Sequence, residues 1–275
     1  MLLRLTAATA ALLFCVQAAA LPRESRVPGG IALLPLPADS ADSISATLDG
    51  KPVFVTRNTD GSRTLVVGIP LTATPGPLAL LLRNGNATQE IRLDVVAKDY
   101  PEQRITLPTQ QHVTPSDENL ARYAREAKEQ TAVYKAFREQ SMSWPAFIQP
   151  VAGPYSSPFG LKRFFNGEPR APHAGLDIAA PEGRPVQSPA AGVVAQTGDY
   201  FFNGRTVMID HGNGLVSMLC HLSEIAVKKG QVLKPGDIIG KVGKTGRATG
   251  PHLHWTVSLN DARIDPLLLL PARAE

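Results

Sequence analysis

Three histidines and one aspartate lie in two short runs whose spacing suits metal chemistry. Near the C-terminus His252 and His254 alternate with apolar residues, and this period of two predicts a half-buried strand with both imidazoles on its polar face. Upstream, His173 and Asp177 are four positions apart, and a proline and a glycine around them favour an extended segment over a helix. Two imidazole nitrogens and one carboxylate oxygen form a ligand set typical of catalytic zinc. The alternative is that each histidine is an isolated structural residue, but two such runs in one region without spare cysteines favour the metal site.

Four sequence blocks in this region resemble the lysostaphin-type zinc endopeptidases, a family that cuts peptide cross-links in peptidoglycan. They occur in the family's order: SPFG at 157–160, HAGLDIAAPEG at 173–183, IDHGNGLVSMLCHLSEI at 209–225 and TGRATGPHLHW at 245–255. The resemblance covers about residues 145–270 and implies a compact two-sheet β domain with zinc in a groove. It does not extend to the first 140 residues.

The resemblance also implies a role for each residue of the site. His173, Asp177 and His254 would bind one zinc ion, and His221 and His252 would be the catalytic residues. Imidazole titrates near neutral pH and can both transfer a proton and stabilise an oxyanion. The chain contains no H-E-x-x-H run, so no helical glutamate is offered as the general base.

The implied function is zinc-dependent hydrolysis of peptide cross-links in bacterial peptidoglycan, with peptidoglycan as the partner. Some members of the family lack ligands and only activate other wall hydrolases, so a wall-bound regulator without turnover is the alternative. Every metal and catalytic position is filled here, which favours an active enzyme. The bond that is cut stays open between D-alanyl–diaminopimelate and glycyl cross-links, and so does the oligomeric state.

Two further residues near the predicted site are interpreted as structural. His211 matches the family's pattern, but its place in a predicted hairpin turn favours a role in loop geometry. In the alternating run 215–221, His221 shares a face with Leu219 while Cys220 points the other way. If His221 faces the metal, Cys220 does not, and we interpret Cys220 as a small buried hydrophobic residue.

Residues 1–20 have the pattern of an export signal, with Arg4, an apolar core and the small residues 18–20 before a cleavage site. The apolar run is too short to span a membrane, and no later run reaches that length. We therefore expect a periplasmic or extracellular protein without stable membrane insertion. Phe14 before Cys15 argues against a lipid anchor. The formal net charge of +4 without a block of like charges does not indicate nucleic-acid binding.

The rest of the chain must position this site, and we expect a mainly β protein with a helical linker. Residues 21–107 carry short apolar runs separated by Asp-Gly and Asn-Gly turns, which predict a β-sandwich-like module. This module carries no chemistry of its own, and it could dock the wall, gate the cleft or act as a spacer. Residues 108–144 predict the linker, with Thr114 as the N-cap and helix from Asp117 to about Gln140. Residues 145–275 predict an antiparallel two-sheet catalytic domain, with strands at 192–196, 205–210, 215–221, 238–243 and 252–259.

Overall fold

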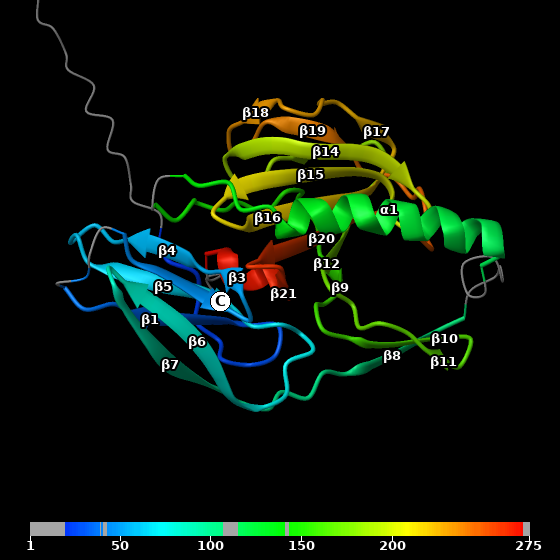
Figure 1. The fold of residues 1–275 in the computed structure, drawn as a ribbon. Coiled ribbons are helices and arrows are strands. Elements are labelled where there is room, and N and C mark those ends of the chain that lie inside the picture. Colours follow the sequence, from blue (N-terminus) through cyan, green and yellow to red (C-terminus); the bar gives the residue numbers. More distant parts are fainter. Residues whose placement is uncertain (1–19, 39, 41–42, 107–114, 141–142, 272–275) are drawn as a thin grey trace, which may run out of the picture.

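The computed structural model describes residues 20–38, 40, 43–106, 115–140 and 143–271. It contains mainly β-strands and one long helix, as predicted (Figure 1). The predicted export signal, apart from residue 20, and the predicted N-cap Thr114 lie outside the described residues. Among the helices that the structure describes, none has the length and apolar character of a membrane span.

The N-terminal part forms two small antiparallel sheets that enclose an apolar core. The core contains Leu65, Leu80 and Leu93, each fully buried. Asp49 and Gly50 have φ values of 50° and 74°, the left-handed conformation expected of an Asp-Gly hairpin turn. In sheet order the strands are β1 (Ile31–Pro35), β5 (Arg63–Gly68) and β4 (Phe54–Arg57), then β3 (Lys51–Pro52), β2 (Ser45–Leu48), β6 (Gly76–Asn84) and β7 (Ala87–Val95).

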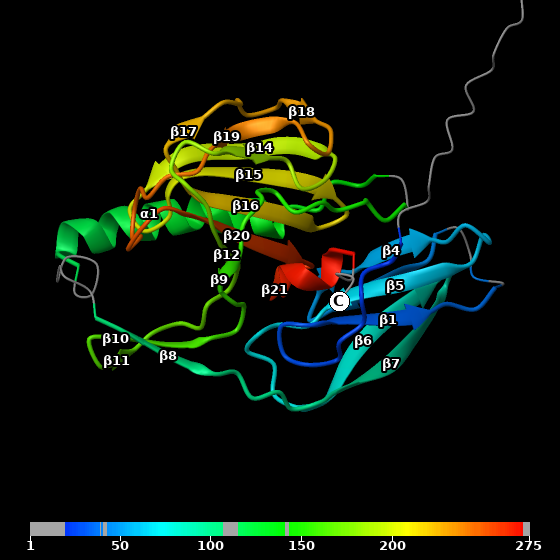
Figure 2. The ribbon, with the colours of Figure 1, turned by 180° about the vertical axis from the view of Figure 1, so that it is seen from behind.

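The C-terminal part is built on one large antiparallel sheet, with β16 and β20 near its centre (Figure 2). A second, three-stranded sheet packs beside it. The order in the large sheet is β18 (Val232–Leu233), β14 (Gly192–Tyr200), β15 (Gly204–Gly212), β16 (Leu215–Leu222), β20 (His252–Leu259), β12 (Leu176–Ala179) and β9 (Tyr155–Ser157), with β21 (Ala262–Ile264) paired to β20 and followed by the 3-10 helix η2 (Pro266–Leu269). The order in the second sheet is β13 (Pro185–Gln187), β19 (Ile238–Lys241) and β17 (Glu224–Ile225).

A fifth sheet joins the two parts of the chain and was not expected from the sequence. Strand β8 (Glu102–Ile105) pairs in parallel with β10 (Lys162–Phe165), which also pairs with β11 (Glu168–Pro169). Residues 102–105, which the sequence groups with the N-terminal module, thus extend a hairpin of the C-terminal part. Parallel pairing between distant segments leaves no local turn signal.

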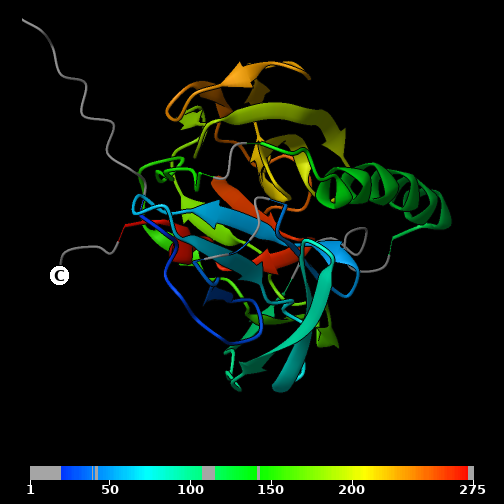
Figure 3. The ribbon, with the colours of Figure 1, turned by 60° about the vertical axis from the view of Figure 1, so that its left-hand side comes forward.

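The helix α1 (Asp117–Lys135) lies along the large sheet beside β14 and β16 (Figure 3). Its N-cap is Ser116, whose hydroxyl accepts a hydrogen bond from the Asn119 N–H at 3.3 Å, so the predicted cap at Thr114 was wrong by two positions. The helix also ends at Lys135 rather than near Gln140. Beyond it, the Arg138 guanidinium donates to the Asp210 carboxylate at 2.6 Å, which ties an extended segment to the C-terminal end of β15.

The predicted apolar stripe of α1 is only partly buried, because much of its contact with the sheet is polar. Tyr134 is buried, whereas Leu120 and Tyr123 are 47% and 45% exposed. Glu126 instead accepts a hydrogen bond from the Phe201 N–H at 2.8 Å. Polar pairing of this kind does not produce the apolar periodicity from which helix faces are predicted.

The N-terminal sandwich and the large sheet share one core. Ile31, Phe54 and Val66 belong to the same buried cluster as Trp255. The rings of Phe54 and Trp144 are 5.1 Å apart. A loss of either part would therefore expose apolar surface of the other.

Asn260 closes the contact between the two parts. Its side chain accepts a hydrogen bond from the Gly68 N–H at 2.7 Å and donates one to the Gly68 carbonyl at 3.0 Å. Asn260 is 4% exposed, so these bonds are shielded from water. A Cβ atom on Gly68 would lie 2.6 Å from the Leu259 carbonyl oxygen, which explains the glycine at this close approach.

We expect the Asn260→Asp substitution to destabilise the protein by about 2 kcal/mol, because a carboxylate cannot donate to the Gly68 carbonyl and leaves it unsatisfied. Aspartate tolerates the left-handed backbone of this position, where φ is 45°, so the substitution adds no backbone strain to the measured loss of stability. Urea unfolding measures the loss. Asn86→Asp, in an exposed turn, is the control and should change stability by less than about 0.5 kcal/mol. Equal stability of both variants would contradict the role of Asn260.

Candidate metal centre

The pairing of β12 with β20 places an aspartate opposite a histidine. Asp177 faces His254 in the antiparallel register, so both side chains stand on the same side of the sheet. His173 lies in an extended segment before β12, as predicted. Gly175 between them has no room for a side chain, since a Cβ atom there would lie 2.6 Å from the His254 ring. The sequence shows a glycine at position 175, but the reason for it becomes evident only when the structure places the His254 ring against it.

Three side-chain atoms from these residues converge. His254 Nδ1 lies 2.7 Å from Asp177 Oδ1, and His173 Nε2 lies 3.1 Å from the same oxygen. The two ring nitrogens are 3.0 Å apart. His173 and Asp177 are buried, with 2% and 7% exposure. The structure thus brings together three of the five predicted site residues as one group able to hold a metal ion.

The hydrogen bonds around this group determine which nitrogens carry protons. His173 Nδ1 lies 2.8 Å from the Pro158 carbonyl oxygen, which can only accept, so Nδ1 carries the hydrogen. In the neutral ring, Nε2 is then a bare acceptor that faces two other acceptors. His254 Nε2 lies 2.9 Å from the Thr256 hydroxyl, and a bond donated to that hydroxyl leaves Nδ1 bare as well. In these tautomers three lone pairs converge and fit a cation, and their N/N/O composition fits zinc.

The charges at the site favour the ligand forms of these groups. Burial acts to raise the pKa of Asp177, but hydrogen bonds donated by His173 and His254, in the forms that carry a proton toward the carboxylate, outweigh burial and hold this pKa well below its usual range. Burial lowers the pKa of His254 to about 4, although the Asp177 carboxylate opposes the shift. At neutral pH the site therefore offers the Asp177 carboxylate and a neutral His254 imidazole, the forms that bind metal.

A second layer of side chains holds Asp177. The Arg163 guanidinium donates to Asp177 Oδ2 at 3.1 Å and to the Ser157 hydroxyl at 3.1 Å. The side-chain oxygen of Gln103, on β8, accepts from Arg163 Nε at 3.2 Å. Sequence reasoning missed these residues, because they come from strands far apart in the chain. Thr256 had a visible signal, since it follows His254 on the same face of the predicted strand.

We expect Thr256→Val to weaken metal affinity by about tenfold, the scale of losing a group that orients a ligand histidine. Valine keeps the shape and removes only the hydroxyl that contacts His254 Nε2. Competition with a chelator of known affinity measures the change. Thr206→Val is the matched control, because Thr206 is also buried in the large sheet but donates to the Gly204 carbonyl at 2.9 Å. An unchanged affinity in Thr256→Val would show that the hydroxyl does not orient the ring.

The other two predicted residues, His221 and His252, lie side by side next to this group. Their ring centroids are 4.8 Å apart. His221 Nδ1 lies 2.8 Å from the Thr245 carbonyl and His252 Nδ1 lies 2.8 Å from the Gly250 carbonyl, so both Nδ1 atoms carry the hydrogen. His252 Nε2 is 3.9 Å from Asp177 Oδ1, too far for a direct bond. Burial, followed by repulsion from His254 and His252, lowers the pKa of His221 to about 3.

His221 reaches this place through an unusual backbone conformation. Its φ is 62°, in the left-handed region that non-glycine residues enter at a cost. Strand register pairs Cys220, not His221, with His254. Simple alternation would turn His221 toward the other face, and the left-handed residue returns its ring to the cleft.

The prediction that Cys220 points away from the metal site if His221 faces it is therefore wrong. Cys220 shares the face of His254 and is buried in a cluster with Tyr134 and Met218 beneath α1. Burial raises the pKa of the Cys220 thiol to about 12, so it is protonated and unreactive at neutral pH. Its interpretation as a small buried hydrophobic residue agrees with these surroundings.

His211 lies away from the group and is structural in its contacts. Its Nδ1 is 2.8 Å from the Ala191 carbonyl and its Nε2 is 2.8 Å from the Ser217 hydroxyl. Burial lowers its pKa to about 4, which keeps the ring neutral. Both nitrogens are engaged within the core.

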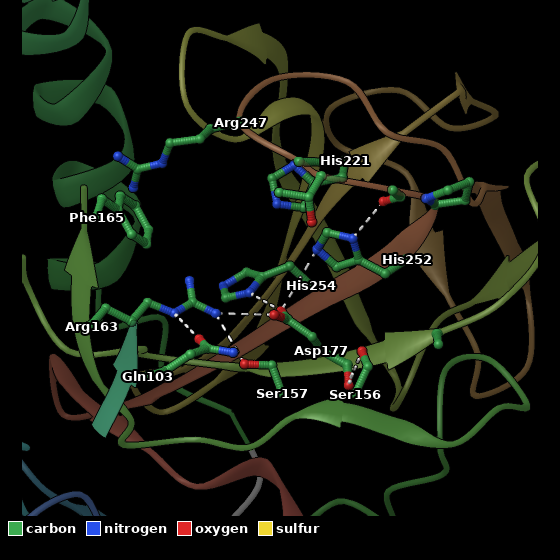
Figure 4. A pocket seen from close by; sticks show the side chains of 15 residues that line it. Gln103, Ser156, Ser157, Arg163, Phe165, Asp177, His221, Arg247, His252 and His254 are labelled. Atoms are coloured by element: carbon green, nitrogen blue, oxygen red, sulfur yellow. Dashed lines mark hydrogen bonds and ion pairs between the residues drawn. The ribbon is translucent and has the colours of Figure 1, made fainter. Parts of the chain in front are cut away.

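An open cleft of about 270 Å³ gives access to the site (Figure 4). Asp177 and His254 lie at its floor, His221 and His252 along one side, and Arg163 with Gln103 on the other. Arg247 and Phe165 stand at one end. A chain-like substrate could lie in such a cleft with one bond beside the three converging atoms and the two paired imidazoles.

Comparison with known families agrees with this arrangement. The model of peptidase family M23 matches residues 171–266, which include all five predicted site residues. The model of the peptidase family M23 N-terminal domain matches residues 24–98, the sandwich. A solved structure of a protein from Pseudomonas aeruginosa assigned to peptidase M23 has 46% sequence identity and a TM-score of 0.76, and the match covers 91% of this chain and 97% of that one.

Curated relatives match over less than half of this chain. The DD-carboxypeptidase/endopeptidase Mpg of Neisseria meningitidis is 41% identical over 41% of this chain and 26% of its own length. The peptidoglycan DD-endopeptidase ShyA of Vibrio cholerae is 49% identical over 31% of this chain and 20% of its own length. The match thus spans about a quarter or less of these relatives.

Proposed function

Because the chain belongs to peptidase family M23, we propose that it is a zinc-dependent endopeptidase that hydrolyses peptide cross-links of bacterial peptidoglycan. One observation carries the proposal: ligand atoms of His173, Asp177 and His254 converge beside the paired imidazoles of His221 and His252. The names of the curated relatives from Neisseria and Vibrio support peptidoglycan as the substrate.

In this proposal His173, Asp177 and His254 hold the zinc ion. A zinc ion bound there supplies Lewis acidity, which polarises a carbonyl and makes water a better nucleophile at neutral pH. Arg163 and Thr256 keep the Asp177 and His254 side chains in place for this role.

His221 and His252 perform the proton chemistry. Each is anchored through Nδ1–H to a backbone carbonyl, which leaves Nε2 as the reactive atom. An unprotonated Nε2 accepts the proton of an attacking water, and the resulting N–H donates a hydrogen bond to a developing oxyanion or a proton to the leaving amine. Two such imidazoles side by side allow one to act as base while the other stabilises charge.

Digestion of purified sacculi with mass spectrometry of the released muropeptides tests the proposal. We expect peptide-cleaved products that disappear when a chelator removes the metal. The alternative is a wall-bound regulator that activates other hydrolases without turnover of its own. A zinc-loaded protein that binds sacculi and releases no product would support that alternative and contradict ours.

We further propose that the protein is exported to the periplasm or the extracellular space, where its substrate lies. The signal pattern of residues 1–20 supports this location. N-terminal sequencing of the exported protein should begin at Leu21. A retained Met1 or a lipid-modified Cys15 would contradict it.

A further inference from the structure

One side of the cleft includes a residue from outside both regions that match the family models. Gln103 lies on β8, between the N-terminal match at 24–98 and the C-terminal match at 171–266. In the parallel register of β8 with β10, Gln103 is paired with Arg163. Its side-chain oxygen accepts a hydrogen bond from Arg163 Nε at 3.2 Å, and both residues line the cleft (Figure 4). The pairing of two distant strands thus places a neutral side chain against the arginine that contacts Asp177.

The strand β8 is anchored to both parts of the protein. The Lys162 N–H, on β10, donates to the Pro101 carbonyl at 2.9 Å, directly before β8 begins. The Tyr100 hydroxyl donates to the Pro28 carbonyl in the N-terminal part at 2.8 Å. The ring of Tyr100 also lies 6.2 Å, between centroids, from that of Phe159. A side chain on a strand that is fixed in this way can hold a neighbouring group more precisely than one on a loop.

The two oxygens of the Asp177 carboxylate have different partners. Arg163 Nη2 donates to Asp177 Oδ2 at 3.1 Å, and the two side chains are only 18% and 9% exposed. Asp177 Oδ1 instead faces the ring nitrogens of His173 and His254. Gln103 engages Nε of the same guanidinium that engages Oδ2. Because the guanidinium is planar and rigid, a contact that fixes Nε also fixes the direction of Nη2.

We propose that Gln103 is a positioning residue that keeps Arg163 on Asp177 Oδ2, so that only Oδ1 is available to the metal. This inference rests on the proposed peptidase function. A carboxylate that is free to turn can offer both oxygens to one cation. A catalytic zinc site needs three protein ligands and one open position, and a second carboxylate oxygen would compete for that position. Gln103 is uncharged, so its replacement by an apolar residue alters the direction of Arg163 without altering the charge of the site.

Gln103→Leu in the full-length protein tests the proposal, because leucine has a similar size and accepts no hydrogen bond. With zinc bound, we expect kcat on soluble cross-linked muropeptides to fall about tenfold or more, the scale of losing a group that orients a metal ligand. KM should change less, because Gln103 acts on a metal ligand and not on the bound substrate. With cobalt in place of zinc, the visible absorption should weaken, since a second carboxylate oxygen raises the coordination number above four.

Gln103→Glu is the rescue variant, because glutamate keeps an oxygen that accepts from Arg163 Nε. Its cobalt spectrum and its kcat should be close to those of the unaltered protein. Glu102→Leu is the matched control for any disturbance of β8. Glu102 is the preceding residue on the same strand, and its exposed side chain pairs with Arg104 at 2.9 Å. This control should leave the cobalt spectrum and kcat unchanged.

The cobalt spectrum decides the outcome, because a merely structural role of Gln103 would lower thermal stability without changing the coordination number. An unchanged spectrum in Gln103→Leu would overturn the proposal, even if kcat or stability falls. The same spectral change in Glu102→Leu, or no recovery in Gln103→Glu, would also overturn it. An unaltered protein that binds cobalt and hydrolyses nothing would overturn the peptidase function, and the spectra would still decide the role of Gln103. An unaltered protein that binds no cobalt would overturn both.

Discussion

His254→Ala is expected to lose zinc and hydrolytic activity together. Only His173 and Asp177 would remain as ligands, and two protein ligands are too few for tight zinc binding. Zinc content should fall from about one ion per chain to near zero, and activity should fall to background. Thermal stability should also drop, because metal binding contributes to the free energy of folding. Elemental analysis beside a turnover assay measures both losses.

The matched control for this variant is His252→Ala, two residues away on the same strand face. The structure separates the two histidines by their distance to the shared carboxylate. His254 Nδ1 is 2.7 Å from Asp177 Oδ1, and His252 Nε2 is 3.9 Å from it. A metal-free His252→Ala beside a zinc-loaded His254→Ala would reverse the ligand assignment.

The second large effect is expected from the imidazoles that do not bind metal. His252→Ala and His221→Ala should keep near-stoichiometric zinc and lose roughly a hundredfold or more in kcat, the scale of general acid–base and oxyanion contributions. His221→Asn refines the test, because asparagine tolerates the left-handed backbone at this position but cannot act as a base. Single-turnover kinetics on zinc-loaded protein measures the loss.

The double variant with His221→Ala and His252→Ala adds a further check, because substitutions of residues that act together have non-additive effects on activity. We expect the loss in the double variant to be smaller than the product of the two single losses. Full activity in His221→Asn would contradict the proposed mechanism even where the metal assignment holds.

The sequence predicted the strand around His252 and His254 because local alternation of polar and apolar residues is sufficient to define a strand face. The mainly β character followed for the same reason, from many short alternating runs between turn residues. The proximity of His173 to the pair required a long-range contact, and only the resemblance to a known family supplied it. The spacing of His252 and His254 in the sequence does not indicate which of the two imidazoles lies closer to Asp177, because their distances to it differ by only about an ångström.

Three features of the site region were beyond the reach of sequence patterns. The left-handed residue at His221 breaks the alternation on which the placement of Cys220 depended. Arg163 and Gln103 meet through a parallel pair of strands from separate parts of the chain. Helix α1 is held partly by polar contacts, such as the hydrogen bond from the Phe201 N–H to Glu126. Such contacts leave no apolar periodicity in the helix sequence.

The hydrogen bonds between Asn260 and Gly68 have a consequence for how the protein is made. They join residues 192 positions apart, and Ile31 at one end of the chain shares a core with Trp255 near the other. A ribosome releases the sandwich long before it has synthesised β20, so this shared core cannot close on a growing chain. Folds dominated by such distant contacts form slowly, because the entropy of closing long loops is lost before the contacts are gained. His254 lies in β20 as well, so the three proposed metal ligands can come together only after this strand has been synthesised, and a chain that is terminated before β20 lacks one of them.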